Sequence, residues 1–389
     1  MNTRRILKVV VVVVLLGTAS MSLAEEGTWT TKADMPAARF GLSTSVVNGK
    51  IYAVGGGKTP YGAYLSIVEE YDPVTDTWIT KAYMPTARAF QSASMVNGKI
   101  YAIGGSPRAE SDTPTVEEYD PATDTWTRKA DMPTARTWLS SSVVDGKIYA
   151  IGGRIYPEDF NVSIVEEYDP VTDTWTRKAG MPTPSSLLST CVVNGKIYAI
   201  GGYAGSGYGT DLAIMEEYDP VTDTWTRKTD MPTARRGLST CVLYGRIYAI
   251  GGGPYKVSAT VEEYDPETDT WSKKADMPTA RSLLSSSVVD GRIYTIGGSV
   301  VWWPWSPTST VEVYDPGLLP PDFNGDGVVD INDLVILIEY WGTDEPLCDI
   351  APPPFGDGIV DVLDLELFMS YWEQEDITDN QETMSNLVW

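Results

Sequence analysis

The sequence predicts an all-β fold of six repeated blades, because three kinds of landmark each occur six times. The landmarks are a glycine pair, a Tyr-Asp-Pro triplet and a tryptophan, and each recurs at intervals of 46 to 50 residues. The glycine pairs begin at Gly55, Gly104, Gly152, Gly201, Gly251 and Gly297; the triplets begin at Tyr71, Tyr119, Tyr168, Tyr218, Tyr264 and Tyr314; the tryptophans are Trp29, Trp78, Trp126, Trp175, Trp225 and Trp271. Repeats of this length that divide into four strands are typical of a β-propeller.

Turn residues divide each repeat into four short strands. In the first repeat, a strand over residues 42–47 ends at Asn48-Gly49, a pair that supplies the two positive φ angles of a tight hairpin. A second strand leads to the glycine pair, and a third follows a variable loop as Val-Glu-Glu-Tyr. The Asp-Pro pair then makes a turn, because proline fixes φ at a turn corner. Thr-Trp begins the fourth strand.

The sixth repeat lacks its fourth strand. No Thr-x-Thr-Trp follows Pro316, whereas an unpaired copy of that strand occurs at the other end of the chain, at Thr28-Trp29-Thr30. We predict that this N-terminal strand completes the last blade and closes the ring, which removes the open sheet edge. The predicted propeller spans residues 25–316.

The glycine pair, the Tyr-Asp-Pro triplet, the tryptophan and a following Met-Pro-x-x-Arg together resemble the kelch repeat over residues 27–316. The resemblance implies that the loops between strands two and three share one face with the loops between blades, around a central channel. Some kelch propellers are copper oxidases with histidine ligands, and this chain contains no histidine, which excludes that chemistry. Others resemble sialic-acid mutarotases, which work with acidic and arginine residues.

The N-terminus has the three parts of a secretory signal peptide over residues 1–24: a basic start, a short apolar run and a small-residue end. Removal of this segment would place the protein outside the cell, at the cell surface or in the periplasm. No later segment has the roughly 20 apolar residues of a membrane span. The net charge of −24 excludes nucleic-acid binding, which needs a basic surface.

Two of the three cysteines, Cys191 and Cys241, occupy matching positions in adjacent repeats, and Cys348 lies in the acidic C-terminal region. Matching positions in neighbouring blades lie farther apart than the roughly 7 Å Cα separation that a disulfide allows. We therefore expect Cys191 and Cys241 to be buried free thiols.

A second module is indicated by a charge boundary, because no lysine or arginine follows Arg292. After a linker at residues 317–321, the spacing matches an EF-hand loop with glycine at position 6. The predicted ligands are Asp322, Asn324, Asp326, the backbone carbonyl of Val328, Asp330 and Asp333. These hard oxygen ligands suit Ca²⁺, and residues 334–341 are expected to form a helix.

A second, degenerate calcium loop follows. Its predicted ligands are Asp357, the backbone carbonyl of Ile359, Asp361 and Asp364, with Asp349 as a first ligand if the intervening prolines are an insertion. Paired loop–helix units at the end of an exported chain resemble the type I dockerin, here over residues 322–372, followed by an acidic tail at 373–389. That resemblance implies calcium-dependent docking to a cohesin-like partner. The alternative is that calcium only folds a stabilising tail.

Aromatic residues are frequent in the loops between the second and third strands. The candidates for a ligand-binding face are Tyr61, Tyr64, Tyr156, Phe160, Tyr203, Tyr208, Tyr255, Trp302, Trp303 and Trp305. Exposed rings around a concavity suit stacking on sugars or gripping a peptide. The alternative is that they pack against neighbouring loops.

Arginine recurs in the loops between blades, at Arg39, Arg88, Arg136, Arg235 and Arg281, with Ser185 in the fourth repeat. A ring of guanidiniums could hold a carboxylate or sulfate, but the resemblance favours a structural role. The carboxylates also recur in the repeats, and the unrepeated acids Glu158, Asp159 and Asp211 form no evident catalytic pair. We interpret the chain as a non-catalytic recognition protein for a glycan or a protein; the alternative is a carbohydrate-active enzyme, polysaccharide-degrading or mutarotase-like.

Overall fold

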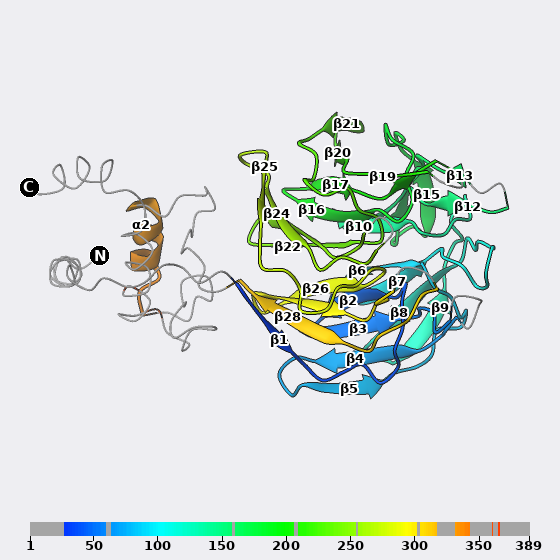
Figure 1. Cartoon of the computed structure of the whole chain (residues 1–389), viewed down its shortest axis with the longest axis horizontal. Coiled ribbons are helices and arrows are strands. Elements are labelled where there is room, and N and C mark those ends of the chain that lie inside the picture. Colours follow the sequence, from blue (N-terminus) through cyan, green and yellow to red (C-terminus); the bar gives the residue numbers. More distant parts are fainter. Residues whose placement is uncertain are drawn as a thin grey trace, which may run out of the picture. The chain divides into compact units, whose positions relative to one another are not determined.

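The computed structural model describes residues 27–59, 64–157, 160–205, 209–253, 256–301, 304–316, 331–342, 360 and 365. The chain divides into two units, one of residues 27–316 and the other of residues 1–26 together with 317–389. The first unit contains all the described strands (Figure 1). The two units are described separately below.

The first unit consists of six four-stranded antiparallel sheets, as the repeats predict. The first three blades are β2 (Ser43–Val47), β3 (Lys50–Val54), β4 (Val68–Asp72) and β5 (Thr77–Thr80); β6 (Ser92–Val96), β7 (Lys99–Ile103), β8 (Val116–Asp120) and β9 (Thr125–Arg128); and β10 (Ser140–Val144), β11 (Lys147–Ile151), β14 (Val165–Asp169) and β15 (Thr174–Arg177). The fourth and fifth are β16 (Ser189–Val193), β17 (Lys196–Ile200), β20 (Met215–Asp219) and β21 (Thr224–Arg227); and β22 (Ser239–Leu243), β23 (Arg246–Ile250), β24 (Val261–Asp265) and β25 (Thr270–Lys273).

The sixth blade combines the two ends of the repeat region. It consists of β26 (Ser285–Val289), β27 (Arg292–Ile296), β28 (Val311–Asp315) and β1 (Thr28–Thr31). β1 pairs with β28 from Thr28 opposite Asp315 to Thr31 opposite Glu312, and the two strands run side by side in Figure 1. Trp29 also packs on Tyr314, with ring centroids 5.1 Å apart.

Two small hairpins extend the loops of the third and fourth blades. They are β12 (Arg154–Ile155) with β13 (Phe160–Asn161), and β18 (Tyr203–Ala204) with β19 (Thr210–Asp211). The innermost strand of each blade contacts the innermost strands of both neighbours, including β2 with β26, so these strands form a closed ring. The tight hairpins between the first two strands have the expected geometry: both Asn48 and Gly49 have positive φ, at 50° and 71°.

The glycine pair is required by the contact between neighbouring blades. Gly55 has a φ of +61°, and a Cβ there would lie 2.6 Å from the carbonyl oxygen of Arg88 in the next blade. The N–H of Gly56 donates to that same carbonyl at 2.9 Å. A side chain at Gly55 would therefore clash with the backbone of the next blade and strain its own.

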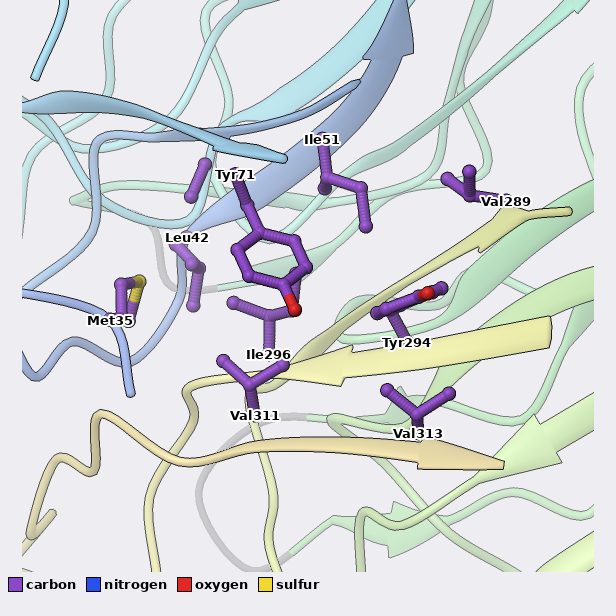
Figure 2. Packing of buried hydrophobic residues seen from close by; sticks show 10 residues of the cluster. Met35, Leu42, Ile51, Tyr71, Val289, Tyr294, Ile296, Val311 and Val313 are labelled. Carbon is purple, nitrogen blue, oxygen red and sulfur yellow. The ribbon is translucent and has the colours of Figure 1, made fainter. Parts of the chain in front are cut away.

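The hydrophobic core lies between blades, in clusters to which two neighbouring sheets contribute. Between the first and sixth blades, Ile51 and Tyr71 pack with Tyr294, Val311 and Val313, all buried (Figure 2). Cys191 and Cys241 belong to two other such clusters and are buried free thiols, as expected. Because each sheet buries its faces only against its neighbours, the packing of one blade depends on the next.

A repeated latch joins the outer part of one blade to the segment that leads into that blade from the preceding one. In the second blade, Tyr119 donates to Asp124 at 2.6 Å, and Asp124 accepts the N–H of Ala82 at 2.8 Å. Trp126 Nε1 donates to the carbonyl of Ala82 at 2.9 Å. The same three bonds recur in the first, third, fourth and fifth blades, which explains why Tyr-Asp-Pro and tryptophan repeat together.

In the second unit the structure describes one helix, α2 (Ile331–Glu339), which begins three residues before the predicted 334–341. Leu337, Val360 and Leu365 are buried, and Gly342 N–H donates to the carbonyl of Val360 at 2.7 Å. Among the described residues, no helix combines the length and the apolar composition that crossing a membrane requires.

Candidate functional site

Two sets of loops meet at one end of the central channel. In each blade, the residue that follows the repeated arginine (Ser185 in the fourth blade) forms a β-bridge with the residue that follows the glycine pair. The pairs are Phe40 with Gly57, Ala89 with Ser106, Thr137 with Arg154, Ser186 with Tyr203, Arg236 with Gly253, and Ser282 with Ser299. These pairs hold the variable loops around the mouth of the channel, and we call this end of the propeller the loop face.

A closed ring of backbone hydrogen bonds lies at the channel mouth. Its members are Gly41, Phe90, Trp138, Leu187, Gly237 and Leu283, one from each blade. Each N–H donates to the carbonyl of the member in the preceding blade, at 2.7 to 3.1 Å, and Gly41 completes the circle on Leu283. All six have positive φ, between 53° and 60°. This conformation is natural for glycine and costs about 1–2 kcal/mol for other residues.

Aromatic side chains cover the ring on the side of the first, second and sixth blades. Phe40 is buried and packs on Phe90 and Trp305, with centroid distances of 5.8 and 4.8 Å. Tyr64 and Trp138 meet Phe90 edge-on at 5.9 and 5.7 Å. Burial also raises the pKa of Tyr64 to about 12, so its hydroxyl stays protonated. The result is an apolar floor with half-buried rings at its edge.

Arginine and tyrosine side chains occupy the side of the third to fifth blades. The guanidinium of Arg154 lies over the rings of Trp138 and Tyr156, at 5.2 and 5.4 Å. Arg236 lies over Tyr203 at 4.3 Å and forms an ion pair with Asp211 at 3.1 Å. Such cation–π contacts position the guanidiniums. Burial raises the pKa of Asp211, an effect that Arg236 opposes.

Below the ring, the channel is lined by hydroxyl groups. Its cavity volume is about 190 Å³, and the described residues that line it are uncharged. Serine and threonine hydroxyls bond across five of the six seams between blades, for example Thr44 with Ser285 at 2.8 Å and Ser189 with Thr240 at 2.8 Å. At the remaining seam, Ala93 replaces the hydroxyl residue, and Ser43 donates to the carbonyl of Gln91 at 3.2 Å. The channel therefore offers polar but neutral groups.

The repeated arginines do not reach the loop face. All five are fully buried. Each forms an ion pair with the first glutamate of the third strand in its blade. Arg39, for instance, donates to Glu69 at 2.6 Å and to the carbonyl of Ile67 at 3.0 Å. Burial lowers the pKa of Arg39 to about 10, and Glu69 opposes that shift. The structural role favoured by the sequence is thus the one observed.

The predicted ligand-face aromatics fall into four groups. Tyr61, Tyr208, Tyr255, Trp302 and Trp303 lie outside the described residues. Phe160 is exposed, whereas Tyr64, Tyr156 and Trp305 are half-buried and pack partly on neighbouring loops. The prediction of an exposed ring was wrong for Tyr203, which is 4% exposed because Arg236 stacks on it.

The predicted calcium ligands are not described by the structure. Asp322, Asn324, Asp326, Val328, Asp330, Asp349, Asp357, Ile359, Asp361 and Asp364 lie outside the described residues, and Asp333 lies in α2 with its side chain undescribed. Among the described residues, no group of three acidic or cysteine side chains is placed to hold a metal. The calcium site stays a prediction.

Sequence reasoning missed Phe40, Phe90, Trp138, Arg154 and Arg236. The sequence did contain a sign of them, because each differs from the residues at the same position in most other repeats. Arg154 follows a glycine pair where other repeats have glycine, serine or tyrosine, and Arg236 follows the buried arginine where others have Phe, Ala, Thr or Ser.

Comparison with known proteins agrees with the repeat pattern. A family profile described as the KLHDC2/KLHL20/DRC7 Kelch-repeats domain matches residues 13–181 and 129–298, and one described as Kelch motif matches residues 280–317. A solved structure titled "Structure of YjhT" is similar over 72% of this chain and 96% of that chain, with a TM-score of 0.63 and 17% identity. At this identity the likeness is one of fold. No curated protein sequence matches. The profile matches span most of the chain, which therefore belongs to the kelch-repeat family.

Proposed function

We propose that the loop face is a non-catalytic recognition surface for a glycan or a protein segment, on a protein that acts after export. The signal-peptide pattern of residues 1–24 supports export. The repeated loops and their unrepeated side chains support recognition of one asymmetric ligand.

One observation carries this proposal. Phe90, Trp138, Leu187 and Leu283 keep large apolar side chains in a left-handed backbone conformation that glycine adopts at lower cost. Gly41 and Gly237 occupy the same ring position in the other two blades, so the fold accepts glycine there. Strained residues of this kind tend to cluster at functional sites. The apolar surface at the mouth is thus present even though glycine would cost less backbone energy at these four positions.

The chemistry of the loop face favours a ligand with an apolar face and an acceptor group. Half-buried rings at Tyr64, Trp138 and Trp305 suit stacking on a sugar or an aromatic side chain. Arg154 lies beside them, 9% exposed, and suits a carboxylate or a hydroxyl-rich edge, whereas the charge of Arg236 is already balanced by Asp211. Two carboxylates of this face already have partners: Asp112 accepts the N–H of Tyr156 at 2.6 Å, and Asp211 pairs with Arg236. This supports binding rather than hydrolysis.

The test is a screen of the full chain against a glycan array and a peptide array, with product analysis of every ligand that binds. We expect saturable binding without product. Trp138→Gly should weaken binding about 10-fold or more, because it removes a ring. Relief of the strained φ should offset part of the packing lost against Phe90 and Tyr156, so thermal unfolding must show that the variant is still folded. Val171→Ala, at an exposed position in the turn between β14 and β15 and away from the loop face, is the control. Product formation would instead establish the enzymatic alternative.

For the C-terminal unit we propose calcium-dependent docking to a cohesin-like partner through residues 322–372. The loop spacing from Asp322 to Asp333 supports this proposal. Calorimetric titration of the full chain with Ca²⁺ should show binding that Asp326→Ala abolishes. Calcium binding without capture of a cohesin would leave a stabilising module, and no calcium binding by the full chain would refute the proposal.

A further inference from the structure

The fourth blade lacks the buried cation that the other five share. In those blades a guanidinium neutralises a buried glutamate: Arg39 with Glu69, Arg88 with Glu117, Arg136 with Glu166, Arg235 with Glu262 and Arg281 with Glu312. In the fourth blade the corresponding residues are Ser185 and Glu216, which are 3% and 4% exposed. A buried carboxylate without a counter-charge is costly.

Glu216 accepts a short hydrogen bond on one carboxylate oxygen and only a long one on the other. Thr183 Oγ1 donates to Oε1 at 2.7 Å, as the matching threonine does in other blades, and the N–H of Thr183 lies 3.4 Å from Oε2. Arg227 approaches Oε1 to 3.8 Å, but it is no substitute for the missing arginine. Arg177 makes the same approach to Glu166 at 3.6 Å in the third blade, where Arg136 is also present.

A small cavity occupies the place of the missing guanidinium. Its volume of about 10 Å³ is close to the least that can hold one water-sized particle. Its lining includes Ser185, Ala199, Gly201, Ile214 and Glu216, together with the apolar side chains of Met181, Leu188 and Leu212. In other blades the arginine donates to the carbonyls that correspond to those of Ala199, Gly201 and Ile214. Ser185 itself donates only a long bond to the carbonyl of Gly201, at 3.4 Å.

We propose that this cavity, the Ser185 cavity, binds one monovalent metal cation in place of the guanidinium. A carboxylate, a hydroxyl and three backbone carbonyls provide hard oxygen ligands. One positive charge balances Glu216, whereas a divalent ion would leave an excess charge buried. The volume admits an ion stripped of water but not a tetramethylammonium ion.

The experiment compares the thermal unfolding of the full chain in NaCl, KCl, RbCl and tetramethylammonium chloride at equal ionic strength, with EGTA present to remove calcium. We expect at least one metal cation to raise the melting temperature of the propeller transition by about 2–4 °C over tetramethylammonium, in a saturable manner. Ser185→Arg should abolish this dependence and melt higher in tetramethylammonium than the native chain, because its guanidinium fills the cavity. Glu216→Gln should also abolish it.

A second measurement keeps the proposal testable if a variant does not fold. Crystals of the native chain soaked in RbCl should show an anomalous peak beside Glu216 and none at Arg136. Equal melting temperatures in all four salts, or a cavity that contains water in the soaked crystals, would overturn the proposal.

Discussion

The buried scaffold between the blades and the loop face at the channel mouth differ in how closely the six repeats agree. In the scaffold, five Tyr–Asp bonds have the same length of 2.6 Å, and five arginines pair with five glutamates. At the mouth, the residues that follow the arginine position range from Phe40 to Arg236. Each of these scaffold contacts recurs in five of the six blades, whereas a surface for one asymmetric ligand cannot have sixfold symmetry.

The largest expected effect comes from removing the strand that completes the scaffold. Deletion of residues 25–34 should lower the melting temperature sharply, more than any single substitution, because β28 loses its partner and Tyr314 loses the ring of Trp29. Calorimetry of the full chain measures this. Deletion of residues 373–389 is the control, and we expect it to leave the propeller transition unchanged. Equal melting curves for the two deletions would show that β1 does not stabilise the ring.

The next largest loss of stability should come from a single substitution in the scaffold. Arg136→Ala leaves Glu166 buried without its guanidinium, and we expect a loss of about 3–5 kcal/mol in the free energy of unfolding. Chemical denaturation measures the change. Phe160→Ala on the loop face should stay within about 0.5 kcal/mol. A loss below about 1 kcal/mol for Arg136→Ala would mean that the buried pairs are not needed for stability.

A substitution on the loop face should weaken ligand binding and leave stability nearly unchanged, unlike a substitution in the scaffold. Arg154→Ala removes the guanidinium over Trp138 and Tyr156, and we expect about 10-fold weaker binding to a ligand identified on the arrays. The melting temperature should change by less than about 3 °C. Isothermal calorimetry and thermal unfolding together provide the comparison. Unchanged affinity would remove Arg154 from the binding surface.

The smallest expected effect is a pH-dependent loss of stability when the latch of the second blade is broken. The hydrogen bond from Tyr119 lowers the pKa of Asp124, with a further contribution from the N–H of Ala82. A lowered carboxyl pKa contributes stability that is present above the ordinary value near 4 and is lost as the pH falls through the native value. Tyr119→Phe should therefore cost about 1 kcal/mol at pH 7, and less below about pH 4.

The second blade itself offers the matched control for this latch. In an Asp124→Asn background the titrating carboxyl is absent, so Tyr119→Phe should cost the same at every pH. Urea denaturation at several pH values gives both differences. A Tyr119→Phe penalty that does not vary with pH would contradict the linkage to Asp124.

The scaffold could be predicted from the sequence because its residues act through local and repeated rules. Asn48-Gly49 determines a hairpin, Gly55 allows close approach of the next blade, and Thr28-Trp29 supplies the strand type missing from the sixth repeat. The loop face could not be predicted to the same depth. A bulky residue such as Trp138 gives no sequence signal of positive φ, and the stack of Arg236 on Tyr203 depends on two loops of different blades. For the calcium module, the sequence pattern remains the only guide.

The backbone ring at the channel mouth also determines what kind of ligand the mouth can attract. Its six N–H groups and six carbonyls bond only to one another, head to tail around a circle. Their peptide dipoles therefore cancel in the plane of the ring, unlike the aligned dipoles of a helix, whose N-terminus attracts anions through unbonded N–H groups. The six ring N–H groups are therefore already bonded and do not donate to a ligand. Replacing its side chains could thus give the same ring an entirely different ligand preference.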